Sequence, residues 1–220
     1  MTVIWVGAPA LRSTTDVISL TIVGNPPRET ENFDQPLWLK KSHTMEIKET
    51  CFALLQTLDA FSEEAFNTVP PCGGWTPGQV AEHLLLSAGV VEVISGRTEK
   101  ATRAPDEKIA AIGAIFLDLT TKLSSPDFII PAEAHYEKQE MMSRLKLVWT
   151  KLSEAVRLLD LSLVCLDFEF PGSGTLTRLE WINFYVFHTQ RHIAQLHRIS
   201  TAIAHNMSTK PPSTTIPPVI

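Results

Sequence analysis

The stretch WINFYVFHTQRHIAQLHRI (residues 181–199) is the part of the chain around which the other segments are best arranged. It is apolar enough to form a buried helix, yet it carries His188 and His192. Residues four apart on an α-helix lie about 40° apart around the axis and one turn apart along it, so both imidazoles can reach one point. Gln195 follows on the same line. This spacing is a common way for one helix to supply two nitrogen ligands to a metal, although a lone histidine pair is more often structural or exposed.

The composition is that of an ordinary globular protein. The 220 residues suit one domain with spare length for tails, and 44% are hydrophobic and 20% charged. A net charge of −5 argues against a general nucleic-acid binder, which would show a basic stripe. No apolar run approaches the roughly 18 residues of a membrane span. The three cysteines show no C-x-x-C spacing, which suits a reducing compartment, so we expect a cytoplasmic protein with Cys72 as a bystander thiol.

The two ends of the chain differ from its middle. Residues 1–44 contain short β-prone pieces and scattered prolines with no sustained period, and they lack the pattern of a secretory signal. We expect a poorly ordered extension there. Residues 206–220 are rich in Ser, Thr and Pro, which predicts a disordered tail. The folded domain is therefore predicted to span residues 45–205.

Four long segments show the apolar spacing of amphipathic helices. They are residues 45–67, 76–96, 137–161 and 177–205. Capping boxes mark the start of the second, at Thr76 and Gln79, and of the fourth, at Thr177 and Glu180. A shorter helix is expected over residues 109–123, in the long connection between the second and third segments. The pattern predicts an all-α four-helix bundle.

His83 lies on the inward face of the second segment. Its neighbours on that face include Val80, Val90 and Ile94, so the face is otherwise apolar. A histidine there needs a partner for each ring nitrogen, because an unsatisfied buried polar group costs about 1–3 kcal/mol. Either a structural hydrogen bond or a metal would satisfy it. Bundles build metal sites from side chains on facing helices, and this chain offers histidines on two of them.

Two motifs resemble the DinB/YfiT-like superfamily. They are W-T-P-G-Q-V-A-E-H-L (residues 75–84) and T-R-L-E-W-I-N-F-Y-V-F-H-T-Q-R-H-I-A-Q-L (residues 177–196). That family pairs a W-[ST]-x-x-[EQ]-x-x-x-H-[IL] helix start with a late H-x-x-x-H helix. The resemblance implies a four-helix bundle, often dimeric, whose three histidines bind one divalent metal. Position by position, the family's ligands match His83, His188 and His192.

The resemblance and the residues together leave three functions open. Three imidazoles leave an open position on the metal, which is typical of catalytic sites. We expect first a transferase that holds a low-molecular-weight thiol as the thiolate. The alternatives are a hydrolase of a small amide or ester that uses metal-activated water, and a non-catalytic, stress-associated metal-binding protein. The expected ion is zinc, then nickel, and the expected partners are a small-molecule substrate and a second copy of the chain.

No convincing acid or base accompanies the histidines, which favours thiol transfer over hydrolysis and leaves the catalytic residues unassigned. Glu82 and Glu92 are rotated about 100° and 180° away from the histidine of their helix, so we expect solvated or interhelical roles for them. Ser87 could touch a bound ligand, although a packed helix serine is the plainer interpretation. Gln195 is expected to orient a ligand histidine, and Arg191 to form a surface or interhelical ion pair.

Overall fold

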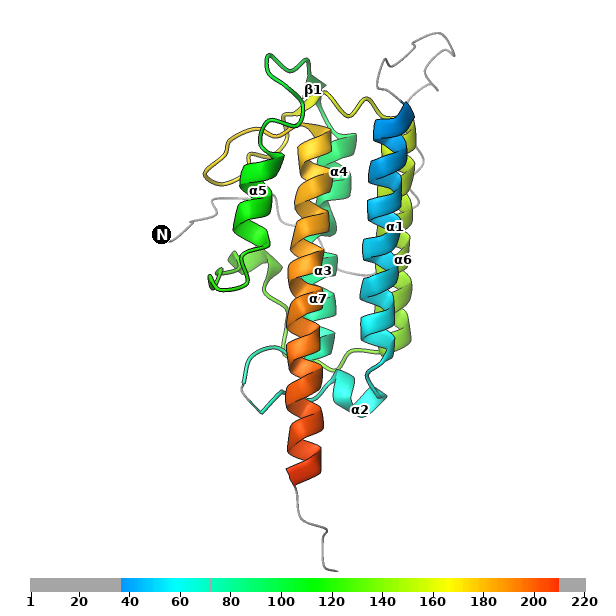
Figure 1. The fold of residues 1–220 in the computed structure, drawn as a ribbon, viewed down its shortest axis with the longest axis vertical. Helices are drawn as coiled ribbons and strands as arrows, with labels where there is room; N and C mark the ends of the chain where they lie inside the picture. Colours follow the sequence, from blue (N-terminus) through cyan, green and yellow to red (C-terminus); the bar gives the residue numbers. More distant parts are fainter. Residues whose placement is uncertain (1–36, 72, 210–220) are drawn as a thin grey trace, which may run out of the picture.

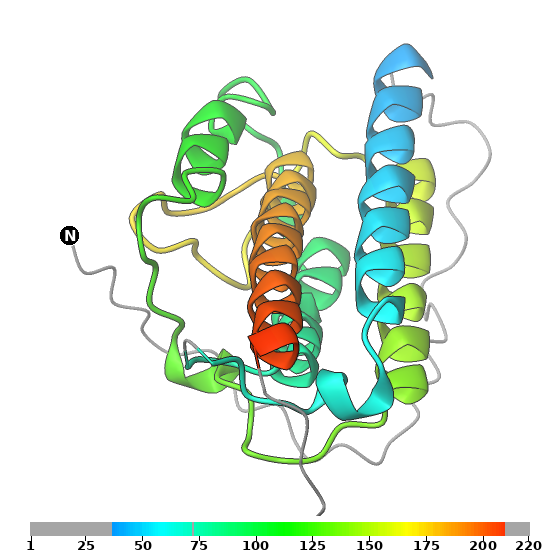
Figure 2. The same cartoon turned by 60° about the horizontal axis from the view of Figure 1, so that its bottom comes forward.

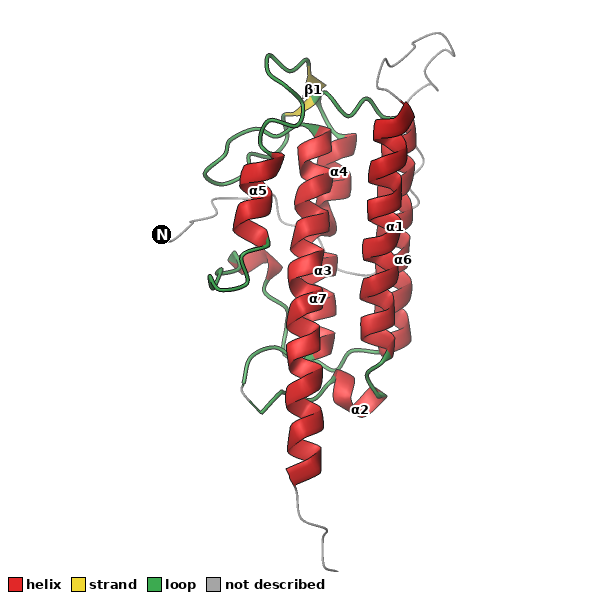
Figure 3. Ribbon diagram, viewed as in Figure 1, coloured by secondary structure: helices red, strands yellow, loops and turns green. Residues whose placement is uncertain are grey.

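The computed structural model describes residues 37–71 and 73–209, which are mostly helical (Figure 3). In chain order the elements are α1 (Leu37–Asp59), α2 (Glu63–Phe66), α3 (Pro77–Leu86), the 3-10 helix η1 (Ser87–Gly89), α4 (Val90–Ser95), β1 (Thr98–Glu99), α5 (Ile109–Phe116), the 3-10 helix η2 (Asp127–Ile129), α6 (Lys138–Leu158), β2 (Val164–Cys165) and α7 (Arg178–Thr209). None of the described helices combines the length and apolarity needed to cross a membrane.

The long helices form a four-cornered bundle. Helix α1 packs against α6 and α7, and the α3–α4 unit packs against the same two helices from the other side. Consecutive units α1 and α3–α4 therefore lie across the diagonal of the bundle. Helices α1 and α7 run in one direction, and α3, α4 and α6 run in the other (Figure 1). Helix α5 lies outside the bundle against α7, on the side away from α1 and α6 (Figure 2). The predicted all-α class and four-helix architecture are confirmed.

The helices at both ends of the domain are longer than predicted. Helix α1 begins at Leu37, so residues 37–44 of the predicted extension are helical. Helix α7 runs to Thr209, so the first residues of the predicted tail are helical as well. No proline or glycine interrupts either stretch, and nothing local stops the helix at the predicted boundary. The remaining parts of the predicted extension and tail, and Cys72, lie outside the described residues.

The first predicted helix is broken in two. Helix α1 ends at Asp59, where the Lys138 ammonium donates to the carbonyl oxygens of Phe61 (2.8 Å) and Asp59 (3.4 Å). These contacts help satisfy carbonyls that the end of a helix leaves unpaired. Ser62 then starts α2, because its hydroxyl accepts a hydrogen bond from the backbone N–H of Ala65 (3.1 Å). The periodicity of the apolar residues continues across this break, which is why the sequence predicts one helix.

The second predicted helix begins as expected and is interrupted at η1. Thr76 Oγ1 accepts from the N–H of Gln79 (3.1 Å), and Gln79 Oε1 accepts from the N–H of Thr76 (3.0 Å), so the capping box is confirmed. Ser87 Oγ donates to the carbonyl oxygen of His83 (2.8 Å), a contact that tends to bend helices. Gly89, a poor helix former, ends the interruption. Ser87 therefore has the packed position of a helix serine, the plainer of the two expected roles.

The connecting segments depart from prediction in two places. The helix expected over residues 109–123 ends at Phe116, and a turn follows in which the Asp118 carboxylate accepts from the Thr120 N–H (2.9 Å) and the Thr121 hydroxyl (2.6 Å). Strands β1 and β2 form a short antiparallel pair at one end of the bundle (Figure 1). Two-residue strands carry no readable period, so the sequence does not predict them.

A buried ion pair fixes the start of α7. The Glu180 side chain is fully buried and accepts hydrogen bonds from both terminal nitrogens of Arg103 (2.6 and 2.7 Å). The backbone N–H groups of Lys108 (2.8 Å) and Thr177 (2.9 Å) complete its partners, the latter as half of the predicted capping box. Burial raises the pKa of Glu180, but these hydrogen bonds outweigh burial and lower it. We call these four residues the Glu180 cluster.

Candidate metal centre

Three buried histidines meet between α3 and α7. His83 comes from α3, and His188 and His192 come from successive turns of α7; the residues are 1%, 5% and 7% exposed. The Nε2 atom of His188 lies 3.0 Å from Nε2 of His83 and 3.0 Å from Nε2 of His192. These are the histidines that the sequence singles out, and the structure brings all three together. We call them the histidine cluster.

Hydrogen bonds fix the outer nitrogens of two of these rings. Nδ1 of His83 lies 2.7 Å from the carbonyl oxygen of Ile129, and Nδ1 of His192 lies 2.8 Å from Oε1 of Gln195. Both oxygens can only accept, so each Nδ1 carries the proton and each Nε2 is a bare lone pair. Gln195 thus has the orienting position that the sequence predicts. Nδ1 of His188 is buried and has no hydrogen-bond partner among the described residues.

The inner nitrogens suit a cation better than a hydrogen-bond network. His188 Nε2 can donate at most one proton, so at least one of the two 3.0 Å contacts opposes two lone pairs. Two nitrogens that each lie roughly 2.0–2.1 Å from one tetrahedral ion would be about 3.3 Å apart, which is close to the observed spacing. A divalent ion among the three Nε2 atoms would replace this repulsion by three favourable contacts. The residues present therefore fit a metal.

Burial keeps all three imidazoles neutral. It lowers the pKa of His83, against a smaller opposing effect of the hydrogen bond to Ile129. It lowers the pKa of His188 well below its usual value, and the neighbouring His192 and His83 add to the effect. It lowers the pKa of His192 to about 3. Neutral imidazole is the form that binds metals, so the cluster is ready for an ion at neutral pH.

Aromatic rings line the histidine cluster. The Trp75 ring lies 4.8 Å from the His83 ring between centroids. Phe184 stacks on His188 at 5.5 Å with an interplanar angle of 9°, and Phe116 of α5 meets His188 at 5.6 Å and 78°. Among the described residues, no carboxylate or thiol joins the three histidines as a candidate ligand. A bound dication would therefore be surrounded by neutral imidazoles and aromatic side chains.

The two carboxylates considered as acid or base point elsewhere. Glu82 faces α6, where its Oε2 lies 3.8 Å from Nη1 of Arg144, so it is an interhelical partner as predicted. Glu92 is exposed on α4. Among the described residues, neither carboxylate belongs to the group of side chains that could share a metal with the three histidines.

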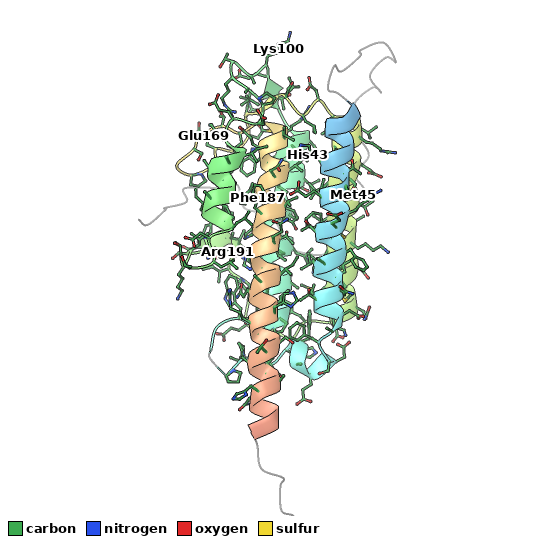
Figure 4. The ribbon with its side chains drawn as sticks, viewed as in Figure 1. His43, Met45, Lys100, Glu169, Phe187 and Arg191 are labelled. Atoms are coloured by element: carbon green, nitrogen blue, oxygen red, sulfur yellow. The ribbon has the colours of Figure 1, made fainter. Side chains whose placement is uncertain are left out.

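Arg191 has a different role from the predicted ion pair. Its guanidinium donates to three backbone carbonyl oxygens at and after the end of α5. They belong to Phe116 (3.3 Å), Asp118 (2.7 Å) and Thr121. Figure 4 labels Arg191 and Phe187 on α7, and Phe187 packs against Gly113 of α5. Arg191 therefore braces α5 against α7, and the sequence carries no signal for this because the acceptors are backbone atoms.

Two surface hollows lie beside the C-terminal half of α7, away from the cluster. One, of about 490 Å³, is lined by His197, Arg198, Thr201, Ala202 and His205. The other, of about 180 Å³, is lined by Gln56, Thr57, Ala60, His197 and Ser200. Neither is lined by a residue of the histidine cluster. The low exposure of the three rings shows that their surroundings enclose them.

The fold and the site define a class of protein: a helical bundle with a three-histidine centre between its second and fourth long helical units. A family model described as the DinB superfamily matches residues 47–196, and the chain belongs to that superfamily. The chain is 26% identical over 152 residues to the uncharacterized protein YuaE of Bacillus subtilis strain 168, a match that covers 66% of this chain and 90% of YuaE.

A solved structure supports the fold. YfiT from Bacillus subtilis aligns with a TM-score of 0.51 and 19% identity, over 81% of this chain and 93% of YfiT. YfiT is described as a probable metal-dependent hydrolase with an unusual four-helix bundle topology. The likeness agrees with the bundle found here, in which α1 lies diagonally opposite the α3–α4 unit.

Proposed function

We propose that this chain binds one divalent metal ion through the Nε2 atoms of His83, His188 and His192. The observation that carries the proposal is that Nε2 of His188 lies 3.0 Å from Nε2 of both other histidines, whose rings are already hydrogen-bonded through Nδ1. Membership of the DinB superfamily and the description of YfiT support it. An all-nitrogen donor set suits zinc first and nickel second.

The charge of the site favours an anionic fourth ligand. Three neutral imidazoles leave both charges of the ion uncompensated, and among the described residues no carboxylate belongs to the cluster. A buried charge without compensation costs several kcal/mol. An ion held by these histidines would lower the pKa of a small thiol at its open position and so favour the nucleophilic thiolate. We therefore propose transfer of a low-molecular-weight thiol to an electrophilic carbon, in which the new carbon–sulfur bond forms as the carbon's leaving group departs with its electron pair.

The chain's own residues contribute orientation and a dry environment. Ile129 and Gln195 hold the rings of His83 and His192 with their Nε2 atoms toward the centre. The rings of Trp75, Phe116 and Phe184 cover the cluster. Electrostatic attraction is stronger in such a low-dielectric site than in water. A thiolate would therefore be bound more tightly here than at an exposed ion.

Hydrolysis of a small amide or ester is the second candidate, and the description of YfiT favours it. Hydrolysis needs a group beside the metal that accepts and returns a proton. Glu82 is paired with Arg144, and Glu92 is exposed. Because no carboxylate joins the histidine cluster among the described residues, we rank hydrolysis below thiol transfer.

Cobalt spectroscopy separates the candidates. The full chain is loaded with Co²⁺ and titrated with 2-mercaptoethanol at millimolar concentration. Thiol transfer predicts a new sulfur-to-cobalt charge-transfer band and an altered visible spectrum, both missing in His188→Ala. An unchanged spectrum together with cobalt-dependent cleavage of a nitrophenyl ester would replace thiol transfer by hydrolysis. A protein that binds cobalt but shows neither response would be a metal-binding protein without either activity.

A further inference from the structure

The three rings of the histidine cluster are held in different ways. Hydrogen bonds through Nδ1 orient His83 and His192. His188 is the central ring, since its Nε2 contacts both of the others, yet its Nδ1 has no hydrogen-bond partner among the described residues. A ligand histidine is usually oriented by a hydrogen bond to its outer nitrogen. Another feature must therefore fix the orientation of His188.

We propose that Phe184 and Phe116 are positioning residues that hold His188 in its metal-binding orientation, an inference that rests on the proposed metal site. Phe184 lies one turn before His188 on α7, and its ring is nearly parallel to the imidazole (9°, centroids 5.5 Å apart). Phe116 comes from α5 and stands nearly perpendicular to the imidazole (78°, 5.6 Å). Because the Phe184 ring is parallel to the imidazole and the Phe116 ring is perpendicular to it, an imidazole that rotated about its Cβ–Cγ bond would collide with one of them. We call the pair the aromatic clamp.

Close packing keeps Phe184 itself in place. The residue is 6% exposed. Its ring meets Phe116 at 5.1 Å and 74°, Phe170 at 5.1 Å and 69°, and Trp181 at 5.6 Å and 83°. Edge-to-face pairs of this kind add stability beyond the burial of apolar area. Phe184 is therefore a fixed wall and not a mobile side chain.

Contacts with α7 keep Phe116 in place. The Arg191 guanidinium donates to the carbonyl oxygens of Phe116 (3.3 Å) and Asp118 (2.7 Å), which ties the end of α5 to the helix that carries His188. One turn earlier, Gly113 lets α5 approach closely, since a Cβ atom at that position would lie 3.3 Å from the Phe187 ring. Phe187 and Arg191 both come from α7 (Figure 4). Both rings of the clamp are thus anchored to the helix whose histidine they orient.

The three imidazoles are held in place by different contacts, so the loss of a clamp ring should affect them differently. A hydrogen bond to the outer nitrogen makes an imidazole a better donor to a metal, and His83 and His192 have one. His188 has no such hydrogen bond at its outer nitrogen, so apart from the two Nε2 contacts its orientation depends on ring packing. Loss of a clamp ring should therefore disturb His188 while the other two rings keep their environment.

The test compares Phe184→Leu with the ring-retaining Phe184→Tyr in the full chain. Phe61→Leu is the matched control, because Phe61 is 5% exposed and lies in the link between α1 and α2. The half-buried Phe116→Leu is a second variant should Phe184→Leu fail to fold. Two quantities are measured: the imidazole resonances by NMR in metal-free protein, and the zinc dissociation constant by competition with a chelating dye.

We expect Phe184→Leu to shift and broaden the ring resonances of His188 and to leave those of His83 and His192 in place. Its zinc dissociation constant should rise about tenfold, the lower end of the effect of removing a group that orients a ligand. Phe184→Tyr and Phe61→Leu should resemble the wild type in both measurements. Unchanged His188 resonances and unchanged zinc affinity in Phe184→Leu would overturn the clamp and leave the metal site standing.

Two further outcomes are informative. A selective change at His188 in a protein that binds no zinc even as wild type would support the clamp and remove the metal site. Equal changes at all three histidines, or the same loss of affinity in Phe61→Leu, would reveal general destabilisation and overturn the clamp.

Discussion

Helix α7 carries two buried polar clusters that are satisfied to different degrees. In the Glu180 cluster each carboxylate oxygen accepts two hydrogen bonds, from Arg103 and from a backbone N–H. In the histidine cluster, lone pairs face each other at 3.0 Å, and Nδ1 of His188 has no partner among the described residues. The first cluster is complete with groups of the chain alone, whereas under the proposed function a cation would complete the second. In these two clusters of α7, complete pairing within the chain fits a structural role, and the opposed lone pairs of the histidines fit a bound cation.

The largest effect on stability should come from the satisfied cluster. Glu180→Ala removes the buried partner of Arg103, and we expect the free energy of unfolding to fall by about 3–5 kcal/mol in urea denaturation. Arg97→Ala is the control, because Arg97 pairs with Asp167 at the surface (side chains 79% and 34% exposed) and should cost less than about 1 kcal/mol. Equal losses in the two variants would remove the distinction between the buried and the exposed pair.

The unsatisfied cluster should respond in the opposite way. In metal-free protein, His188→Leu removes the opposed lone pairs and an unpartnered Nδ1. The free energy of unfolding should therefore either rise or fall by less than about 1 kcal/mol. With zinc at a hundredfold excess over its dissociation constant, the wild type should gain about 2.7 kcal/mol and the variant nothing. A loss in metal-free His188→Leu as large as that in Glu180→Ala would mean that the histidines form a structural network.

A smaller effect should follow from the group that orients His192. Gln195→Ala removes the acceptor 2.8 Å from His192 Nδ1, and zinc affinity should fall about 10–100-fold in a competition titration. Gln190→Ala is matched in residue type and helix, and its side chain reaches Thr50 instead. Zinc affinity should stay at the wild-type value in Gln190→Ala, and a shared loss would speak against a specific role of Gln195.

Acid should affect the two clusters in different pH windows. Burial lowers the pKa of His192 from 6.5 to about 3 in the folded protein, so protons bind the unfolded chain preferentially. The resulting stability is present above pH 6.5 and is lost as the pH falls toward 3, by up to about 1.4 kcal/mol per pH unit. The pKa of Glu180 is lowered from 4.5, so its contribution is lost only below that value. The free energy of unfolding of the metal-free protein, measured in urea, should fall between pH 7 and pH 5. His192→Phe should make this fall smaller. A free energy of unfolding that stays constant over this range in the wild type would contradict the buried neutral histidines.

The parts of the fold that the sequence predicts are those set by nearby residues. Both capping boxes join residues three apart, at Thr76 and at Thr177, and both are present. The positions of His188 and His192 on one face follow from helical geometry over a single turn. His83 is predictable as an inward residue because its face of α3 is otherwise apolar. Local periodicity thus identifies the helices, and the histidines on their inner faces.

The parts that the sequence misses depend on groups far apart in the chain or on backbone atoms. The acceptor for His83 Nδ1 is the carbonyl of Ile129, which any residue would offer. Arg103 reaches Glu180 from a polar segment that resembles an ordinary surface connection. Arg191 binds carbonyls at the end of α5, and Phe116 reaches His188 only because α5 packs on α7. None of these contacts produces a spacing pattern in the sequence. The residues that hold the histidines and the start of α7 in place can therefore be identified only from the structure.

The most direct test of the central claim is the metal content of the untagged full chain, measured by elemental mass spectrometry with His83→Ala and His192→Ala alongside the wild type. The account predicts about one divalent ion per wild-type chain and a large loss of metal in both variants, with each variant still helical by circular dichroism. A wild-type protein that holds no metal even after incubation with zinc or nickel would contradict it. The three histidines would then be core residues, and both proposed reactions would be abandoned.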